Sequence, residues 1–327
     1  MTKEVLPDLY QIEVPLPENP LKAVNCYLIA AAGRFLIIDT GMNRPECELV
    51  MSTALRELDV DLNKTDFFIT HWHADHLGLV STLATPSSKV YFNKPESIVG
   101  HPQRSWEESA ILGRQHGFQE DELSKALSTH PGRRYSGKRQ VDFYILGDGD
   151  EVRIGDYSFV CIETPGHSPG HICLYERDKK VLVSGDHILI DITPNIAQWS
   201  EGGNPLKDYL ASLDKVYDLD VELVLPGHRQ LFTDHRKRIQ ELKHHHEARA
   251  NEVLSILEKG EQTAYEVASQ MSWDIDYKSW KQFPASQKWF ATGEAIAHLA
   301  YLEQKGMITR KGQEKVLFSL EGSRAKQ

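Results

Sequence analysis

The stretch HWHADH at residues 71–76 places three imidazoles and one carboxylate within six residues. It follows the apolar run FFIT, whose aromatic and β-branched residues predict a buried strand. Because side chains alternate along a strand, His71 and His73 can leave on the same side. Asp75 and His76 follow where the chain must turn, and they can converge on the same volume. Imidazole and carboxylate are ligands of divalent metals such as zinc, and four of them predict a site for two ions.

A solvated polar loop is the alternative interpretation of this stretch. It is disfavoured because three histidines and an aspartate without nearby basic residues would be costly to bury unless a metal compensated them. Later motifs repeat the arrangement. His167 follows the strand-like run EVRIGDYSFVCIET in the loop PGHSPGH, Asp186 ends VLVSGD, and His228 ends VELVLPGH. Four strand-like runs therefore each end in a histidine or aspartate, which predicts that residues distant in sequence meet at one edge of the sheets.

The ordered motifs resemble those of the metallo-β-lactamase-fold hydrolases over about residues 8–230. The resemblance implies an α/β fold, an αββα four-layer sandwich, with a dinuclear metal site. It implies that one metal is bound by His71, His73 and His167 and the other by Asp75, His76 and His228, with Asp186 bridging them. It also implies that Asp75 both binds metal and orients the nucleophile, and that Asp39 supports the site from outside the ligand set.

The cofactors expected from this resemblance are two divalent metal ions, zinc first, with iron and manganese left open by the same donor types. The third motif position is His73 rather than the glutamate of the flavodiiron oxygen reductases, which favours hydrolysis. His171 and His187, which neighbour the motifs, are candidates for supporting hydrogen bonds or for protonating a leaving group. A core position is the equal alternative for both.

The chain is expected to form two domains, with residues 1–232 catalytic and residues 233–327 a connecting helix and a small helical winged-helix-like domain. Residues 94–139 interrupt the first with a polar, mostly helical insertion, a candidate lid over a substrate pocket. His101, His116 and His130 lie in it without ligand spacing and are expected to be solvated. A long amphipathic helix is predicted over residues 235–259, and its run His244–His246 is interpreted as surface. The C-terminal layout is similar to that of the β-lactamase-like protein 2 subgroup.

Composition limits the partners. The net charge is −10, and residues 1–231 carry 22 basic against 34 acidic side chains, which argues against non-specific nucleic-acid binding. No leader or membrane-spanning run is recognised at the sequence level. The four cysteines (Cys26, Cys47, Cys161 and Cys173) lack framework spacing and are expected to be buried reduced thiols of a cytoplasmic protein.

The function expected is hydrolysis of a small-molecule thioester, ester or lactone by a metal-bridging hydroxide. A phosphodiesterase or endoribonuclease acting on single-stranded RNA is the first alternative, suggested by the C-terminal module. A mononuclear-iron persulfide dioxygenase, which shares the HADH motif, is the second, and a non-enzymatic winged-helix regulator the third. No membrane partner is expected, and a homo-oligomer is left open.

Overall fold

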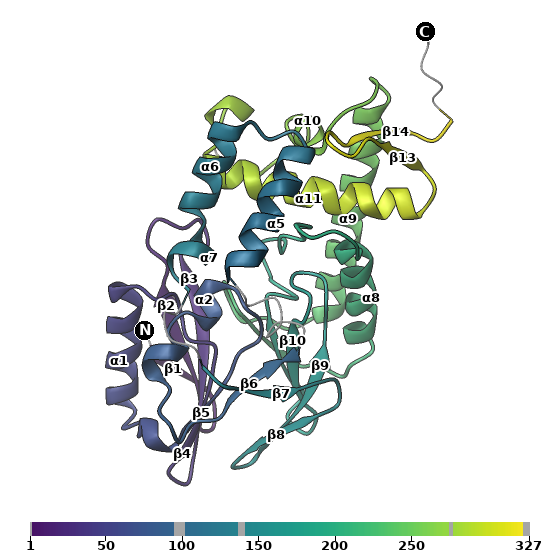
Figure 1. The fold of residues 1–327 in the computed structure, drawn as a ribbon. Helices are drawn as coiled ribbons and strands as arrows, with labels where there is room; N and C mark the ends of the chain where they lie inside the picture. Colours follow the sequence, from purple (N-terminus) through teal and green to yellow (C-terminus); the bar gives the residue numbers. More distant parts are fainter. Residues whose placement is uncertain (1, 95–101, 137–140, 275–276, 323–327) are drawn as a thin grey trace. The chain divides into compact units, whose positions relative to one another are not determined.

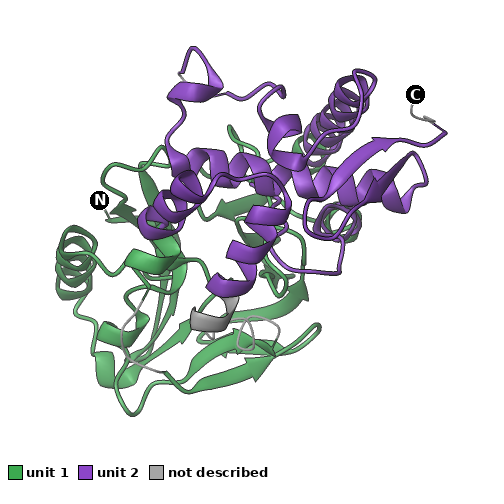
Figure 2. Cartoon of the chain, turned by 45° about the horizontal axis from the view of Figure 1, so that its top comes forward, with its two compact units in different colours: residues 1–100, 131–194, 212–238 green, residues 101–130, 195–211, 239–327 purple. Residues whose placement is uncertain are grey.

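The computed structural model describes residues 2–94, 102–136, 141–274 and 277–322. Its chain forms two compact units (Figure 2). Unit 1 comprises residues 1–100, 131–194 and 212–238, and unit 2 comprises residues 101–130, 195–211 and 239–327. Most of the predicted insertion thus groups with the C-terminal residues, while the catalytic boundary at residue 232 stays a prediction.

Unit 1 contains two sheets and several short helices (Figure 1). Its strands are β1 (Thr2–Leu6), β2 (Leu9–Pro15), β3 (Ala23–Ala31), β4 (Arg34–Ile38), β5 (Thr65–Phe68), β6 (Val90–Asn93), β7 (Phe143–Leu146), β8 (Glu151–Ile154), β9 (Tyr157–Glu163), β10 (Ile172–Glu176), β11 (Val181–Gly185) and β12 (Leu223–Pro226). Its helical elements are α1 (Pro45–Glu57), η1 (Leu62–Lys64), α2 (Ala74–Leu77), α3 (Val80–Leu83) and α7 (Pro131–Arg134).

The first sheet has the strand order β1-β2-β3-β4-β5-β6-β7, antiparallel as far as β4 and parallel from β4 to β7. The second has the order β12-β11-β10-β9-β8, with only β11 and β12 parallel. The hairpin between β3 and β4 turns through Ala32 and Gly33, both with positive φ (45° and 79°). Positive φ at both central residues matches the right-handed twist of the flanking strands.

Alternation along the strands gives the first sheet two buried faces. One packs with the inner face of the second sheet, where Ile38 and Phe68 share a cluster with Phe159 and Leu174. The other packs against α1 and the α2–α3 region, through residues such as Ile37.

The end of α8 (Pro205–Tyr217) is fixed to the second sheet. Lys215 Nζ donates to the Glu163 carbonyl (3.1 Å), and Ser212 Oγ donates to the Pro165 carbonyl (2.8 Å). The expected αββα sandwich is confirmed.

The described residues of unit 2 form helices and one hairpin. Its elements are α5 (Pro102–Gln115), α6 (Glu120–Thr129), α10 (Ala264–Ala268), η2 (Trp280–Gln282), α11 (Ala285–Gln304), β13 (Ile308–Lys311) and β14 (Leu317–Leu320), and it includes most of α9 (His235–Leu257). Its core brings together α9, α10, α11 and the β13–β14 hairpin through residues such as Val253, Val267, Leu299 and Phe318.

A second cluster in unit 2 joins α6 to α11 through Leu123 and Trp289, and Trp289 stacks on Trp199 with ring centroids 3.4 Å apart. Trp289 is therefore part of the core of unit 2.

Three expectations about histidines were wrong, those for His116, His246 and His130. His116 is buried and stacks on Phe318, because the end of α5 packs inside unit 2. His246 is also buried, with its Nδ1 3.3 Å from Nε2 of His298, whereas His244 is exposed. The face of α9 that carries Leu242 continues at the next turn to His246, a periodicity that the sequence already contained.

His130 is partly buried rather than solvated, with its ring 4.8 Å from Trp106 and 5.1 Å from Phe290. His101 lies outside the described residues. The four cysteines are buried and free, as expected. Among the helices that the structure describes, none has the length and apolar character that crossing a bilayer requires.

Candidate metal centre

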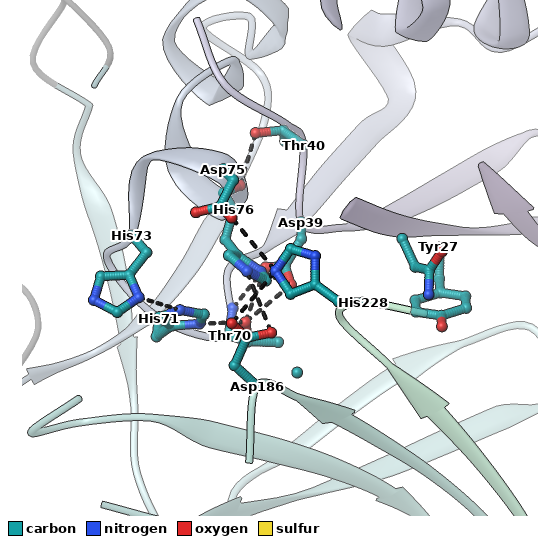
Figure 3. A network of polar contacts seen from close by, with 12 residues as sticks. Tyr27, Asp39, Thr40, Thr70, His71, His73, Asp75, His76, Asp186 and His228 are labelled. Atoms are coloured by element: carbon teal, nitrogen blue, oxygen red, sulfur yellow. Dashed lines mark hydrogen bonds and ion pairs between the residues drawn. The ribbon is translucent and has the colours of Figure 1, made fainter. Parts of the chain in front are cut away.

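The four predicted strand ends carry the candidate ligands in the structure. β5 ends at Phe68 just before the HWHADH stretch, and β9, β11 and β12 end just before His167, Asp186 and His228. The two sheets present these ends at one edge of unit 1, so ligands up to 157 positions apart in the sequence converge (Figure 3). The sequence-based prediction of a shared edge is confirmed in its geometry.

Three histidine side chains form the first group of donors. His73 Nδ1 lies 2.9 Å from His71 Nε2 and 2.9 Å from His167 Nε2. His71 leaves the end of β5, His73 precedes α2, and His167 comes from the loop after β9. The three nitrogens therefore surround one small volume, as the ligands of one ion would.

Asp75, His76 and His228 form the second group. Asp75 and His76 lie on α2, and His228 Nε2 approaches Asp75 Oδ2 to 3.4 Å. Asp186 lies between the two groups: its Oδ2 is 3.5 Å from His167 Nε2 and 3.4 Å from His228 Nε2, and its Oδ1 is 3.5 Å from His76 Nε2. One carboxylate thus faces donors of both groups.

Burial and neighbouring charged groups both shift the pKa values of the ionisable groups at the site. Burial and the neighbouring His167 lower the pKa of His73 to about 3, and burial lowers the pKa of His71 well below its usual value. Burial alone would raise the pKa of Asp186, but His228 and His76 lower it well below the ordinary value. The first group therefore presents neutral imidazoles and Asp186 presents an ionised carboxylate, both of which are the ligand forms that metals require.

In the second group, by contrast, the pKa values of both histidines are raised. Burial would lower the pKa of His228, but Asp186 and Asp75 raise it to about 10. Asp39 and Asp186 likewise raise the pKa of His76 well above its usual value despite burial. These carboxylates thus stabilise positive charge at the centre of the site, which is the electrostatic environment of a bound cation.

The residues present fit a divalent metal. His76 Nε2, His228 Nε2 and Asp186 Oδ1 are buried and have no hydrogen-bond partner among the described residues, although buried polar groups normally have one. Gly227 adds a steric observation, because a Cβ there would lie 2.4 Å from Asp186 Oδ1 and 2.9 Å from His76 Cε1. These three atoms, which could bind a metal, therefore lack hydrogen-bond partners among the described residues and lie beside a space that a side chain at residue 227 would fill.

Asp39 and Thr70 contact the Nδ1 atoms of His76 and His71, the ring nitrogens that do not face the other candidate ligands. Asp39 Oδ2 accepts from His76 Nδ1 (2.7 Å), and Asp39 Oδ1 accepts from the Thr70 backbone N–H (2.9 Å). The Thr70 hydroxyl lies 2.9 Å from Asp39 Oδ2 and 3.0 Å from His71 Nδ1. Asp39 takes a positive φ (58°) at the end of β4, which aspartate tolerates better than most residues. Sequence analysis found Asp39 but missed Thr70.

Hydrogen bonds between side chains and backbone carbonyls connect β3 to the loop that carries His228. Asn25 Nδ2 donates to the carbonyls of Pro226 (3.0 Å) and Arg229 (2.8 Å), and Tyr27 Oη donates to Pro226 (2.7 Å). His228 Nδ1 donates to the Ala23 carbonyl (2.6 Å), which leaves Nε2 to face the carboxylates. Sequence analysis missed this clamp because Asn25 and Tyr27 are about two hundred positions from the loop and match no motif.

The two histidines beside the motifs are both buried. His171 Nε2 accepts from the Asp186 backbone N–H (3.1 Å), and its Nδ1 lies 2.8 Å from Thr164 Oγ1. This hydrogen bond agrees with the supporting role expected for His171, and its complete burial agrees equally with the core position that was the alternative. His187 lies with its ring 6.1 Å from that of His171.

Solved structures share this fold. A metallo-β-lactamase family protein from Thermus thermophilus superposes with a TM-score of 0.84 at 30% identity, covering 97% of this chain and 100% of that one. The probable metallo-hydrolase YqjP of Bacillus subtilis is 26% identical over 325 residues, covering 92% of this chain and 94% of its own length.

Two further relatives are similar over shorter spans. A β-lactamase-like protein 2 homolog of Caenorhabditis elegans is 25% identical over 263 residues, with 78% of this chain and 74% of the relative covered. An atrochrysone carboxyl ACP thioesterase of Aspergillus fumigatus is 23% identical over 218 residues, with 67% of this chain and 40% of the relative covered.

Two family descriptions match the chain. The metallo-β-lactamase-like C-terminal domain matches residues 250–318. The metallo-β-lactamase superfamily matches residues 19–228, a span that includes every candidate ligand. The chain is therefore a metal-dependent hydrolase that belongs to the metallo-β-lactamase superfamily.

Proposed function

We propose that this hydrolase binds two divalent metal ions and cleaves a small-molecule acyl compound, a thioester, ester or lactone. The observation that carries the dinuclear part is the position of Asp186, whose two oxygens face histidines of both groups at 3.4–3.5 Å. His71, His73 and His167 would hold one ion, and Asp75, His76 and His228 the other. Zinc is the proposed metal because imidazole and carboxylate in a compact buried set suit it, with iron and manganese as the alternatives.

The metals, when bound, would lower the pKa of a water molecule and stabilise negative charge on the attacked substrate. The chain's own residues do the rest. Asp75 would orient the nucleophile, because His76 and His228 keep its pKa below the ordinary value despite burial, so that it stays an acceptor. His171 would fix Asp186 through the backbone N–H that it accepts. His71, His76 and His228 are buried, so they would be held in a fixed geometry around the ions.

Two observations support the acyl substrate class. One similar protein is named as an acyl-carrier-protein thioesterase, and residues 1–231 carry 34 acidic against 22 basic side chains. A strongly acidic body repels a polyanion such as RNA, so endoribonuclease activity is the second candidate. Endoribonuclease activity is tested as well, because the C-terminal domain matches its family description and the chain is similar to a β-lactamase-like protein 2 homolog.

The C-terminal residues form helices followed by the β13–β14 hairpin, an order that supports the proposed winged-helix-like module. Its long helix α11 contains one basic residue, Lys288, which is buried and paired with Glu122, and Lys305 caps its C-terminal end. Helices that read nucleic acid present several basic or amide side chains. We therefore propose a structural role for this module, with a homo-oligomer left open.

The test combines metal content with two substrates. The purified protein should contain nearly two metal ions per chain and should hydrolyse an acyl thioester, and Asp75→Asn should lose turnover while it keeps its fold. Bis(p-nitrophenyl) phosphate serves as the phosphodiester probe. Turnover of that probe alone would move the assignment to nuclease chemistry. A single iron with neither activity would overturn the hydrolytic dinuclear proposal in favour of the persulfide dioxygenase.

A further inference from the structure

Thr70 stands directly before the first histidine of the motif, and its side chain is buried with that of Asp39 and His71 (Figure 3). We propose that Thr70 is a positioning residue that fixes the tautomer of His71. Through Thr70, the single carboxylate of Asp39 would orient one histidine of each donor group. This inference rests on the metal site of the proposed function but not on its substrate.

The direction of the hydrogen bonds follows from what each group can donate. An ionised carboxylate only accepts hydrogen bonds, whereas a hydroxyl has one hydrogen to give. Thr70 Oγ1 lies 2.9 Å from Asp39 Oδ2 and 3.2 Å from Asp39 Oδ1. The hydroxyl hydrogen therefore points to Asp39, and only the lone pairs of Oγ1 remain for a third partner.

That third partner is His71, whose Nδ1 is 3.0 Å from Thr70 Oγ1. Because Oγ1 can only accept there, Nδ1 must carry the proton of the neutral ring. The lone pair then lies on Nε2, the nitrogen that faces His73 and the first donor group. The reverse order, with the hydroxyl donating to Nδ1, would place the proton on Nε2 and close that nitrogen to a metal.

Asp39 orients His76 in the same way, but through a direct hydrogen bond with no hydroxyl between them. His76 Nδ1 lies 2.7 Å from Asp39 Oδ2, so Nδ1 carries a proton and Nε2 faces Asp186, which lies between the two groups. The backbone N–H of Thr70 donates to the other oxygen, Asp39 Oδ1 (2.9 Å), which fixes the carboxylate plane. Removing the Thr70 hydroxyl should thus disturb the first group alone, whereas removing the Asp39 charge should disturb both.

The decisive variants are Thr70→Val, which keeps the shape and deletes the hydroxyl, and Thr70→Ser, which restores it. Thr65→Val is the matched control. Thr65 is also a buried threonine of the same segment, and its hydroxyl donates to the Asp61 carbonyl (2.8 Å), away from the donor groups. Circular dichroism establishes that each variant is folded.

The first readout needs neither metal nor substrate. Long-range proton–nitrogen correlation spectra of the metal-free protein report which ring nitrogen of each histidine carries the proton. Wild type, Thr70→Ser and Thr65→Val should show His71 protonated at Nδ1, and Thr70→Val should show a population protonated at Nε2. A wild-type His71 protonated at Nε2 would overturn the proposal, and this holds even if Thr70→Val fails to fold.

The second readout is metal binding, measured by titration with Zn²⁺ alone and by the absorption of Co²⁺. Supporting residues of this kind change metal affinity by about 10–100-fold. Thr70→Val should lose about that factor for one of two ions, and Thr70→Ser should recover most of it. Equal affinities in Thr70→Val and Thr65→Val would overturn the proposal. A wild type with two ions and the expected tautomers but no thioester turnover would refute the substrate class and leave this inference intact.

Discussion

The hydrogen bonds that clamp the His228 loop predict how far the free energy of unfolding falls when each donor is removed. Asn25 Nδ2 and Tyr27 Oη both donate to the buried carbonyl of Pro226, at 3.0 and 2.7 Å. Tyr27→Phe removes one donor and leaves the other, so it should cost about 1 kcal/mol, the net value of an ordinary hydrogen bond. Asn25→Ala also deprives the Arg229 carbonyl of its donor and should cost about 2–4 kcal/mol.

The double variant should cost more than the sum of the single variants. Only when both donors are absent does the Pro226 carbonyl lose its side-chain partners, and an unsatisfied buried group costs about 1–3 kcal/mol. The expected coupling free energy is therefore about 1–2 kcal/mol, beyond the ~0.5 kcal/mol within which independent sites add. The loop should also loosen around His228, so affinity for the second metal should fall most in the double variant.

Urea denaturation of the metal-free protein, followed by circular dichroism, measures the four free energies of unfolding in this cycle. Zinc titration of the same four proteins measures the effect on the site. Costs that add within about 0.5 kcal/mol would refute the reasoning that both donors satisfy one carbonyl. A large coupling without any change in metal affinity would refute the inference that the clamp positions His228.

Three further predictions concern the site and unit 2. Gly227→Ala, whose Cβ would lie 2.4 Å from Asp186 Oδ1, should lower metal stoichiometry and turnover at least tenfold. Gly147→Ala, whose Cβ would meet only Glu163 at 3.6 Å, should leave both unchanged, and equal effects of the two variants would contradict the steric argument. Burial lowers the pKa of His116 to about 4, so the unfolded chain, with a histidine pKa of about 6.5, binds more protons between these values. Stability should therefore fall by up to about 3 kcal/mol as pH drops from about 6.5 to about 4, and a fall equally steep in His116→Gln would refute this source. Chelation should abolish hydrolysis and lower the melting temperature, since a ligand that binds only the folded state stabilises it. Zn²⁺ should restore both. Unchanged turnover after complete metal removal, checked by elemental analysis, would count against metal dependence.

Much of the ligand geometry could be predicted from the sequence because the donors occur where strands end. An apolar run such as FFIT before HWHADH defines both the strand and its exit, and parallel or paired strands bring their ends to shared edges. The same local logic predicted the buried cysteines, since their burial depends on neighbours within a few residues.

What the sequence could not supply were contacts between segments far apart along the chain. Nothing near Asn25 or Tyr27 indicates that they hold a loop about two hundred residues away, because a backbone carbonyl accepts from any well-placed donor and leaves no residue signature. Thr70 is ordinary as a strand residue until Asp39 is placed behind it. His116 was mistaken for a surface residue because its burial depends on Phe318, about two hundred positions away, packing against it. The types of ligands were determined by the sequence alone, whereas only the tertiary structure decided which groups support them, since hydrogen-bond partners are selected by proximity in space.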